Sequence, residues 1–194
     1  VEAGAPLSHV GTVISGLATL VRGRENGTRQ IVGLLHPGDF LGRPDRARAP
    51  FDVEALTDID LCVFKPQVFR DLMAGSPALH DRYLQMTLDE LDAARHWMVI
   101  LGRKSAREKV ASLLLLLLYR EQRMGTGDPT IDLPLSREQV GDVLSLTFET
   151  VSRQMGALKR DGIVRFVNAR SFSVPDPHAL IEAAGDDDDG SVLV

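Results

Sequence analysis

The sequence contains one cysteine, no long apolar run and no visible secretory leader, and each absence argues against a class of protein. A single cysteine cannot form an internal disulfide, which fits a reducing compartment. The longest run of aliphatic residues, 113–118, is far shorter than the roughly 20 residues needed to span a bilayer. No signal peptide is visible after Val1. We therefore expect a cytoplasmic protein without a membrane partner.

Patterns of catalysis and metal binding are also missing. The sequence has no glycine-rich phosphate loop ending in Lys and Ser or Thr, and no Gly-x-Ser-x-Gly turn. Its five histidines are scattered without the spacing of metal ligands. They are His9, His36, His80, His96 and His178. We expect neither an enzyme nor a histidine-based metal site.

The charge of the chain is unevenly distributed. The whole chain has a net charge of −5, but residues 102–170 contain 12 Lys and Arg against 8 Asp and Glu. This segment therefore has a net charge of +4, and the remainder has a net charge of −9. A basic segment inside an acidic protein is the electrostatic signature of a site for nucleic-acid phosphates.

Residues 136–167 have the pattern of a helix, a tight turn, a second helix and the start of a hairpin. Ser136 and Gln139 form a capping box, and Thr147 is a good N-cap with the carboxylate of Glu149 in the turn after it. Apolar residues at helical spacing predict the buried sides of the two helices. They are Val140, Val143 and Leu144 in the first helix and Val151, Met155 and Leu158 in the second.

The second helix leaves a polar row on its outer face that suits the edges of DNA bases. Arg153 can bond guanine at two atoms, Glu149 can accept from the amino group of cytosine, and Ser152 can reach a base or a phosphate. Residues 163–167 and 171–174 predict a hairpin, or wing, after this helix. The alternative, from the residues alone, is a solvated surface helix in an ordinary helical domain. The hairpin and the local positive charge favour a DNA-binding winged helix-turn-helix.

Two motifs carry a family resemblance. Residues 146–153, Leu-Thr-Phe-Glu-Thr-Val-Ser-Arg, closely resemble the recognition helix of the bacterial CRP/FNR regulators, specifically the FNR and FixK branch. Residues 36–42, His-Pro-Gly-Asp-Phe-Leu-Gly, resemble the glycine-rich turn of the cyclic-nucleotide-binding β-roll that these regulators place first. The resemblance covers nearly the whole chain. It implies a homodimer on a pseudo-palindromic DNA site, a response to oxygen limitation, and RNA polymerase as a further partner.

The expected fold is α+β, in four parts. Residues 1–75 alternate short β-prone runs with turns, which predicts an antiparallel jelly roll. Residues 76–102 are the expected dimerisation helix and hinge, and residues 103–182 the winged helix-turn-helix. Residues 183–194 are acidic and expected to be disordered.

Several finer expectations concern the roll and the long helix. An Asn-Gly pair at residues 26–27 predicts a tight hairpin, and Ser76 and Pro77 predict the start of a long helix that ends at Gly102. Apolar residues of this helix recur at near-heptad intervals and form a seam that favours a partner helix. The alternative is a helix packed on its own β-roll. The seam consists of Leu84, Leu88, Leu91, Ala94 and Met98.

The DNA-binding residues that we expect share two properties, a position on the two short helices or the wing and a side chain suited to bases or phosphates. They are Ser136, Arg137, Thr147, Phe148, Glu149, Thr150, Ser152, Arg153, Lys159 and Arg170. Among them, Arg153 and Glu149 are expected to read bases, whereas Arg137, Lys159 and Arg170 mainly hold phosphates.

The effector is the most ambiguous part of the sequence. Arg43-Pro44 follows Gly42 where cyclic-nucleotide-responsive relatives have a Glu, and Ala49-Pro50 falls where they have an Arg-Ser or Arg-Thr pair. Because a phosphate buried without such donors would be uncompensated, we expect no cyclic nucleotide. A cyclic-nucleotide-binding signalling module remains the least favoured alternative.

Cys62 occupies the position at which FNR-type oxygen sensors carry one cluster ligand. A [4Fe-4S] cluster usually needs four thiolates, so this chain as given has no cofactor and Cys62 would be a ligand only in a longer parent protein. FixK-like members have no cluster and are the competing interpretation. From the residues alone, the commoner role of a lone cysteine is that of a small buried apolar side chain.

Overall fold

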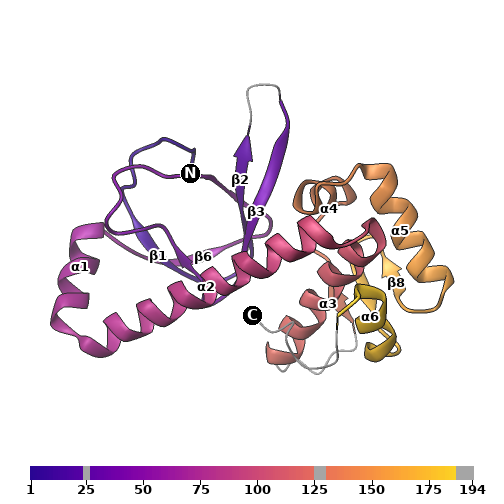
Figure 1. The fold of residues 1–194 in the computed structure, drawn as a ribbon. Helices are drawn as coiled ribbons and strands as arrows, with labels where there is room; N and C mark the ends of the chain where they lie inside the picture. The colour runs from indigo at the N-terminus through magenta and orange to yellow at the C-terminus, as the bar shows by residue number, and fades with distance from the viewer. Residues whose placement is uncertain (24–26, 125–129, 187–194) are drawn as a thin grey trace. The chain divides into compact units, whose positions relative to one another are not determined.

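The computed structural model describes residues 1–23, 27–124 and 130–186 (Figure 1). The described chain forms two compact units, an N-terminal unit of residues Val1–Leu91 and a C-terminal unit that starts at Asp92. The α2 helix supplies the end of the first unit and the start of the second.

The N-terminal unit contains two antiparallel sheets of three strands, in the orders β4-β1-β6 and β3-β2-β5. Apolar side chains between them form a small core around Val13, Ala18 and Leu35. This arrangement confirms the predicted antiparallel roll. The strands are β1 (Val10–Ser15), β2 (Ala18–Gly23), β3 (Arg29–Leu35), β4 (Phe40–Leu41), β5 (Asp52–Ala55) and β6 (Asp60–Phe64).

Strands β2 and β3 form the predicted hairpin, since Gly23 pairs with Arg29 at its open end. Gly27 has the positive φ of 80° that such a turn requires and that glycine adopts without strain. Asn26 lies outside the described residues, so the turn type stays a prediction. The two-residue strand β4 was not predicted, because a pair this short leaves no alternating pattern in the sequence.

Two helices follow the roll, α1 (Pro66–Gly75) and α2 (Pro77–Arg103). Ser76 begins α2 as predicted, with its Oγ accepting from the backbone N–H of Leu79 at 3.4 Å. An aromatic cluster of Phe40, Phe64, Phe69 and Tyr83, with ring centroids 4.8–5.9 Å apart, fastens α1 and the first turns of α2 to the sheet β4-β1-β6.

The prediction that α2 ends at Gly102 is wrong, because the helix continues to Arg103. A single glycine inside an exposed helix costs only about 1 kcal/mol, which does not stop a helix of this length. The next helix sets the boundary instead. Ser105 and Glu108 form a reciprocal cap, with Ser105 N–H donating to Glu108 Oε2 at 2.6 Å and Glu108 N–H donating to Ser105 Oγ at 3.4 Å.

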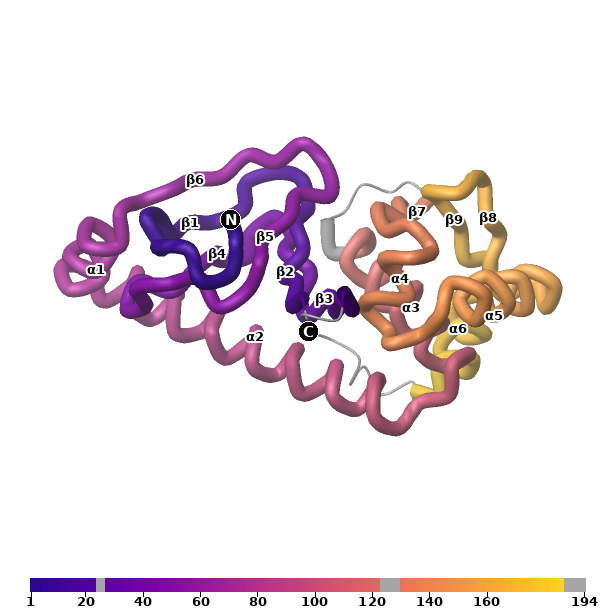
Figure 2. Tube along the Cα trace, turned by 90° about the horizontal axis from the view of Figure 1, so that it is seen from above, coloured from indigo at the N-terminus to yellow at the C-terminus, as the bar shows by residue number. Residues whose placement is uncertain are grey.

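The C-terminal unit is built on α3, whose buried face consists mainly of leucines. A sheet in the order β7-β9-β8 and the helices α4 and α5 lie around it (Figure 2). The elements are α3 (Ala106–Met124), β7 (Ile131–Asp132), α4 (Arg137–Leu144), α5 (Phe148–Arg160), β8 (Arg165–Asn168), β9 (Ser171–Ser173) and α6 (Pro177–Ala184). This order of elements confirms the predicted winged helix-turn-helix.

Helix α6 was not predicted, and it packs on α3. Asp176 begins it by accepting from the N–H of His178 at 3.0 Å, and Ala184 near its end is fully buried. The expectation that the tail is disordered from residue 183 onward is therefore wrong for residues 183–186. Asp186 is held by an ion pair with Lys104. Residues 187–194 lie outside the described residues.

None of the described helices combines the length and the apolar character that a membrane-spanning segment requires.

Candidate nucleic-acid interface

The start of α4 is fixed by the predicted capping box. Ser136 Oγ accepts from the N–H of Gln139 at 3.1 Å, and Gln139 Oε1 accepts from the N–H of Ser136 at 2.8 Å. The capping box thereby satisfies two of the backbone donors at this helix end. The geometry places Arg137 in the first turn of α4, with its backbone held in one conformation.

The turn between α4 and α5 depends on a glycine. A Cβ atom added to Gly141 would lie only 2.5 Å from the backbone oxygen of Leu146, so a side chain would push the two helices apart. Ser145 ends α4 in the left-handed conformation, with φ of 54°. Leu146 then donates its N–H to Gly141 O at 3.1 Å. These contacts set the angle at which α5 leaves the turn.

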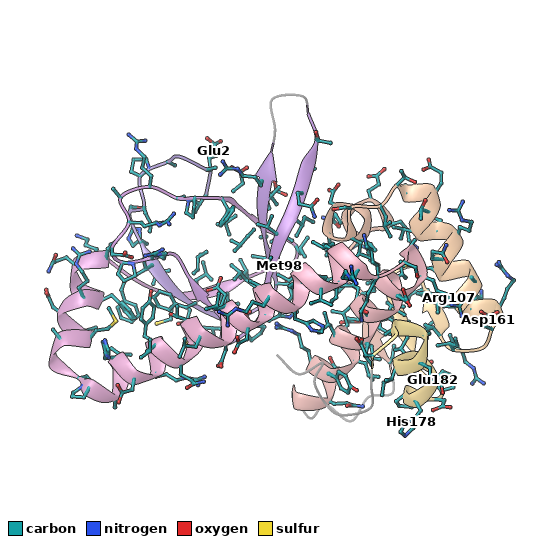
Figure 3. All side chains as sticks on the ribbon, in the orientation of Figure 1. Glu2, Met98, Arg107, Asp161, His178 and Glu182 are labelled. Carbon is teal, nitrogen blue, oxygen red and sulfur yellow. The ribbon has the colours of Figure 1, made fainter. Side chains whose placement is uncertain are left out.

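Helix α5 begins at Thr147, whose Oγ1 accepts from the N–H of Thr150 at 3.3 Å. Its apolar side, Val151, Met155 and Leu158, is fully or almost fully buried, as predicted. An ion pair of 2.7 Å between Arg107 on α3 and Asp161 after α5 ties the far end of the helix to the core of the unit (Figure 3). The helix is therefore anchored along its inner side and at both ends.

The outer side of α5 carries most of the predicted base-reading residues. Phe148, Glu149, Arg153 and Lys159 are exposed, and Ser152 is half-buried. An exposed glutamate is ionised at neutral pH, and hydrogen bonds from the backbone N–H of Glu149 itself and from the Thr147 hydroxyl lower the pKa of the Glu149 carboxyl further. An ionised carboxylate accepts hydrogen bonds only, which suits the amino group of cytosine.

Arg153 is oriented by its own helix. Its Nη2 donates to Thr150 Oγ1 at 3.4 Å, and that hydroxyl also bonds Thr147 Oγ1 at 3.2 Å. Thr150 is thus half-buried between the cap and the arginine. Arg153 is exposed, and a guanidinium has further donors that can bond the O6 and N7 atoms of guanine.

The wing consists of β8 and β9, with Arg165 opposite Ser173 and Phe166 opposite Phe172. At its tip, Asn168 Oδ1 accepts from the N–H of Arg170 at 2.7 Å. The side chain of Arg170 donates to the backbone oxygen of Pro134, which leads into α4. Part of the Arg170 guanidinium is therefore used in a bond within the protein. Only the donors that remain exposed can contact a phosphate.

Arg137 is the predicted phosphate ligand with the most unusual surroundings. Its guanidinium carbon lies 5.0 Å from the ring centroid of Phe166, and burial lowers its pKa. Its Nη1 is buried and has no hydrogen-bond partner in the described part of the chain.

The structure brings all ten predicted DNA-binding residues into the C-terminal unit, on α4, α5, their caps and the wing. Sequence reasoning missed the exposed basic residues Arg160 and Arg165, which extend the positive charge along the end of α5 and the wing. The net positive charge of residues 102–170, to which Arg160 and Arg165 contribute, was the sequence signal that could have identified them. It also missed Phe166, whose contact with Arg137 joins positions 29 residues apart and leaves no local pattern.

The predicted dimerisation seam is largely exposed among the residues that the structure describes. Leu84, Leu88, Leu91 and Met98, the last labelled in Figure 3, are between 44% and 73% exposed. Ala94 is exposed as well. Apolar side chains repeated along one helix are rarely left in water, and such a row marks an interaction surface. The exposed row argues against the alternative of a helix that buries these residues on its own roll.

Cys62 is exposed on β6, so its interpretation as a small buried apolar residue is wrong. Strand β6 lies at the edge of the sheet β4-β1-β6, where side chains have fewer neighbours. The described residues contain no grouping of three or more His, Cys, Asp or Glu side chains that could hold a metal ion.

Two family models match the chain. A model of the cyclic nucleotide-binding domain matches residues 1–76, and a model of the Crp-like helix-turn-helix domain matches residues 108–183. The first match lies within the N-terminal unit, and the second lies within the C-terminal unit.

Similar proteins and structures agree with these matches. Transcriptional activator protein FnrL of Cereibacter sphaeroides is 49% identical over 195 residues, which cover 98% of this chain and 79% of the relative. Nitrogen fixation regulation protein FixK of Bradyrhizobium diazoefficiens is 38% identical over 171 residues, which cover 88% of this chain and 71% of the relative. The solved structure of FixK2 from Bradyrhizobium japonicum matches with a TM-score of 0.85 and 30% identity, covering 96% of this chain and 91% of that one.

Proposed function

This chain belongs to the Crp/FNR family of DNA-binding transcription regulators, and from that premise we propose that it binds a pseudo-palindromic site as a homodimer and controls transcription when oxygen is limiting. The observation that carries the proposal is the outer face of α5, where Glu149 and Arg153 are exposed on a helix that is capped at its start by Thr147 and followed by an ion pair between Arg107 and Asp161. Side chains of this kind on a fixed helix can enter the major groove and read bases.

The homodimer follows from the exposed seam of α2. Two recognition helices related by a two-fold axis read two half-sites one turn of DNA apart, and the axis requires a self-complementary surface. The seam residues Leu84, Leu88, Leu91, Ala94 and Met98 supply such a surface on one helix. Cytoplasmic DNA and RNA polymerase are the partners that this role implies.

Replacing Arg153 by Ala tests the proposed base reading. We expect a loss of about 1–3 kcal/mol in operator binding and relaxed specificity at one guanine, because a bidentate contact disappears. The measurement is the base preference selected from a randomised duplex. Lys159→Ala is the matched control, since losing a phosphate contact should weaken all sequences equally. An Arg153→Ala protein with the wild-type base preference would contradict the assignment.

Cyclic nucleotides are not the proposed effector, despite the family model that matches the roll. The position expected to bind a cyclic phosphate is occupied by Ala49 and Pro50, which carry no charge. The nearby Arg43 is already bonded to Asp45 at 2.7 Å, and Arg48 donates to the backbone oxygen of Gly4 at 2.6 Å. Saturable binding of cyclic AMP or cyclic GMP would overturn this part of the proposal.

Oxygen control could rest on an iron-sulfur cluster, although this chain alone does not fit one. A [4Fe-4S] cluster usually needs four thiolates, and the sequence has a single cysteine. Because Cys62 is exposed on an edge strand, we propose it as one ligand in a longer polypeptide that supplies three more. A FixK-type regulator without a cluster is the second candidate, favoured by the match to the FixK2 structure.

The two candidates predict different results for a longer polypeptide purified without oxygen. A cluster-bearing regulator should show iron-sulfur absorbance that Cys62→Ser removes, because a hydroxyl is a poor ligand for iron. Cys62→Ala, with its fold checked by circular dichroism, is the control for general loss of structure. A folded Cys62→Ala protein that keeps a full, oxygen-labile cluster would show that Cys62 is not a ligand.

A further inference from the structure

The wing carries an aromatic side chain, Phe166, that packs against a buried aromatic side chain of the neighbouring strand. Phe166 on β8 pairs directly with Phe172 on β9, and their ring centroids are 6.3 Å apart. Phe172 is completely buried in the core of the C-terminal unit. The ring of Phe166 therefore packs against a buried ring, and the strand pairing of β8 with β9 determines where it lies.

Arg137 approaches this ring from α4. Its guanidinium carbon is 5.0 Å from the ring centroid, within the range of a cation–π contact. The capping box of Ser136 and Gln139 fixes the backbone beside it. A cation thus lies in a defined place where α4 and the wing meet.

The surroundings of Arg137 do not neutralise its charge. No acidic side chain in the described part of the chain pairs with Arg137, and its Nη1 is covered without an acceptor. Partial burial of an unpaired cation is unfavourable. Arg137 as a whole is only half-buried, so an anion at the part of the side chain that is open to solvent would offset that cost, and the proposed function supplies such an anion in the DNA phosphate.

The loop before α4 is tied to the same wing by a second, independent set of bonds. Leu133 N–H donates to the backbone oxygen of Arg170 at 2.8 Å, and the Arg170 side chain donates to Pro134 O. The wing and the start of α4 therefore keep a fixed spacing. Because these bonds hold the wing beside α4, the planar guanidinium of Arg137 stacked on the Phe166 ring is held in one orientation better than a side chain without such a contact.

We infer that Phe166 is a positioning residue, which orients Arg137 toward a phosphate of the DNA backbone without itself reading a base. The inference rests on the proposed DNA-binding function and extends it, since it assigns part of the affinity to an aromatic residue of the wing.

The test compares Phe166→Leu with Phe166→Tyr in the full chain, using operator DNA at several salt concentrations. Phe166→Leu keeps an apolar side chain but removes the ring, so affinity should fall about 3- to 10-fold. The slope of log affinity against log salt should become shallower by up to about 0.9, the value for one phosphate contact. Phe166→Tyr keeps the ring and should retain both wild-type values. Base preference should be unchanged in both variants.

Arg137→Gln provides the reference. It should weaken binding and flatten the salt slope, and adding Phe166→Leu to it should have no further effect. A purely structural role would instead lower affinity equally in both backgrounds and leave the slope at its wild-type value. Either that result or full wild-type behaviour of Phe166→Leu would overturn the inference. Failure of the wild-type protein to bind any operator would instead overturn the proposed function.

Discussion

Leu91→Asp is expected to convert the dimer into a monomer and to reduce operator affinity by at least about 10³-fold, toward the level of nonspecific binding. Leu91 lies in the exposed apolar row of α2. In a symmetric helix pair, an aspartate at this position meets its own copy across the two-fold axis. Two carboxylates would then be buried without a partner, which a helix interface does not tolerate.

The mass in solution, measured by analytical ultracentrifugation, checks this expectation, and circular dichroism confirms that the variant is folded. Leu72→Asp is the matched control, because Leu72 is an exposed leucine on α1 that lies outside the seam. The control should stay dimeric and bind DNA normally. A dimeric Leu91→Asp protein would show that the seam is not the interface.

Asp186→Ala is expected to lower the free energy of unfolding of the C-terminal unit by about 3–5 kcal/mol, the usual cost of breaking a buried ion pair from one side. The side chains of Lys104 and Asp186 are only 8% and 12% exposed. Lys104 Nζ donates to Asp186 Oδ1 and, at 2.7 Å, to Ser112 Oγ. Without Asp186 the ammonium group would remain covered, with one neutral acceptor in place of its counterion.

Unfolding in urea can be followed by the fluorescence of Trp97, the only tryptophan of the chain, which lies in the part of α2 that belongs to this unit. The double variant Lys104→Met with Asp186→Ala is the control, because it removes both charges and should recover most of the lost stability. A loss below about 1 kcal/mol in the single variant would mean that residues 183–186 do not anchor the unit.

The helix-turn-helix could be predicted from sequence because local bonds determine it. Ser136, Gln139 and Thr147 cap helices through hydrogen bonds that span three residues, so the signal lies within a short window of the sequence. The strands of the roll were predicted from a different local signal, the short β-prone runs separated by turn residues. Among the described strands of the roll, only the pairing of β2 with β3 follows a local hairpin signal, whereas β1 pairs with β4 and β6, and β2 with β5, across longer stretches of sequence.

The features that escaped prediction depend on contacts between distant residues. The ion pair of Lys104 and Asp186 joins positions 82 residues apart and holds a segment that composition alone marks as disordered. The contact between Arg137 and Phe166 likewise crosses from a helix to the wing. The exposure of Cys62 follows from the place of β6 at a sheet edge, which strand propensity does not reveal.

A dimer of this chain is expected to read two DNA half-sites with α5, and the sites that the protein binds test this most directly. Sites selected by the wild-type protein from a randomised duplex should form an inverted repeat, and the family resemblance suggests half-sites of the TTGAT kind. Footprints on these sites should show two protected half-sites whose centres are about 34 Å apart, one turn of B-DNA. Tight binding to one isolated half-site, undiminished when the spacer is changed, would contradict the account.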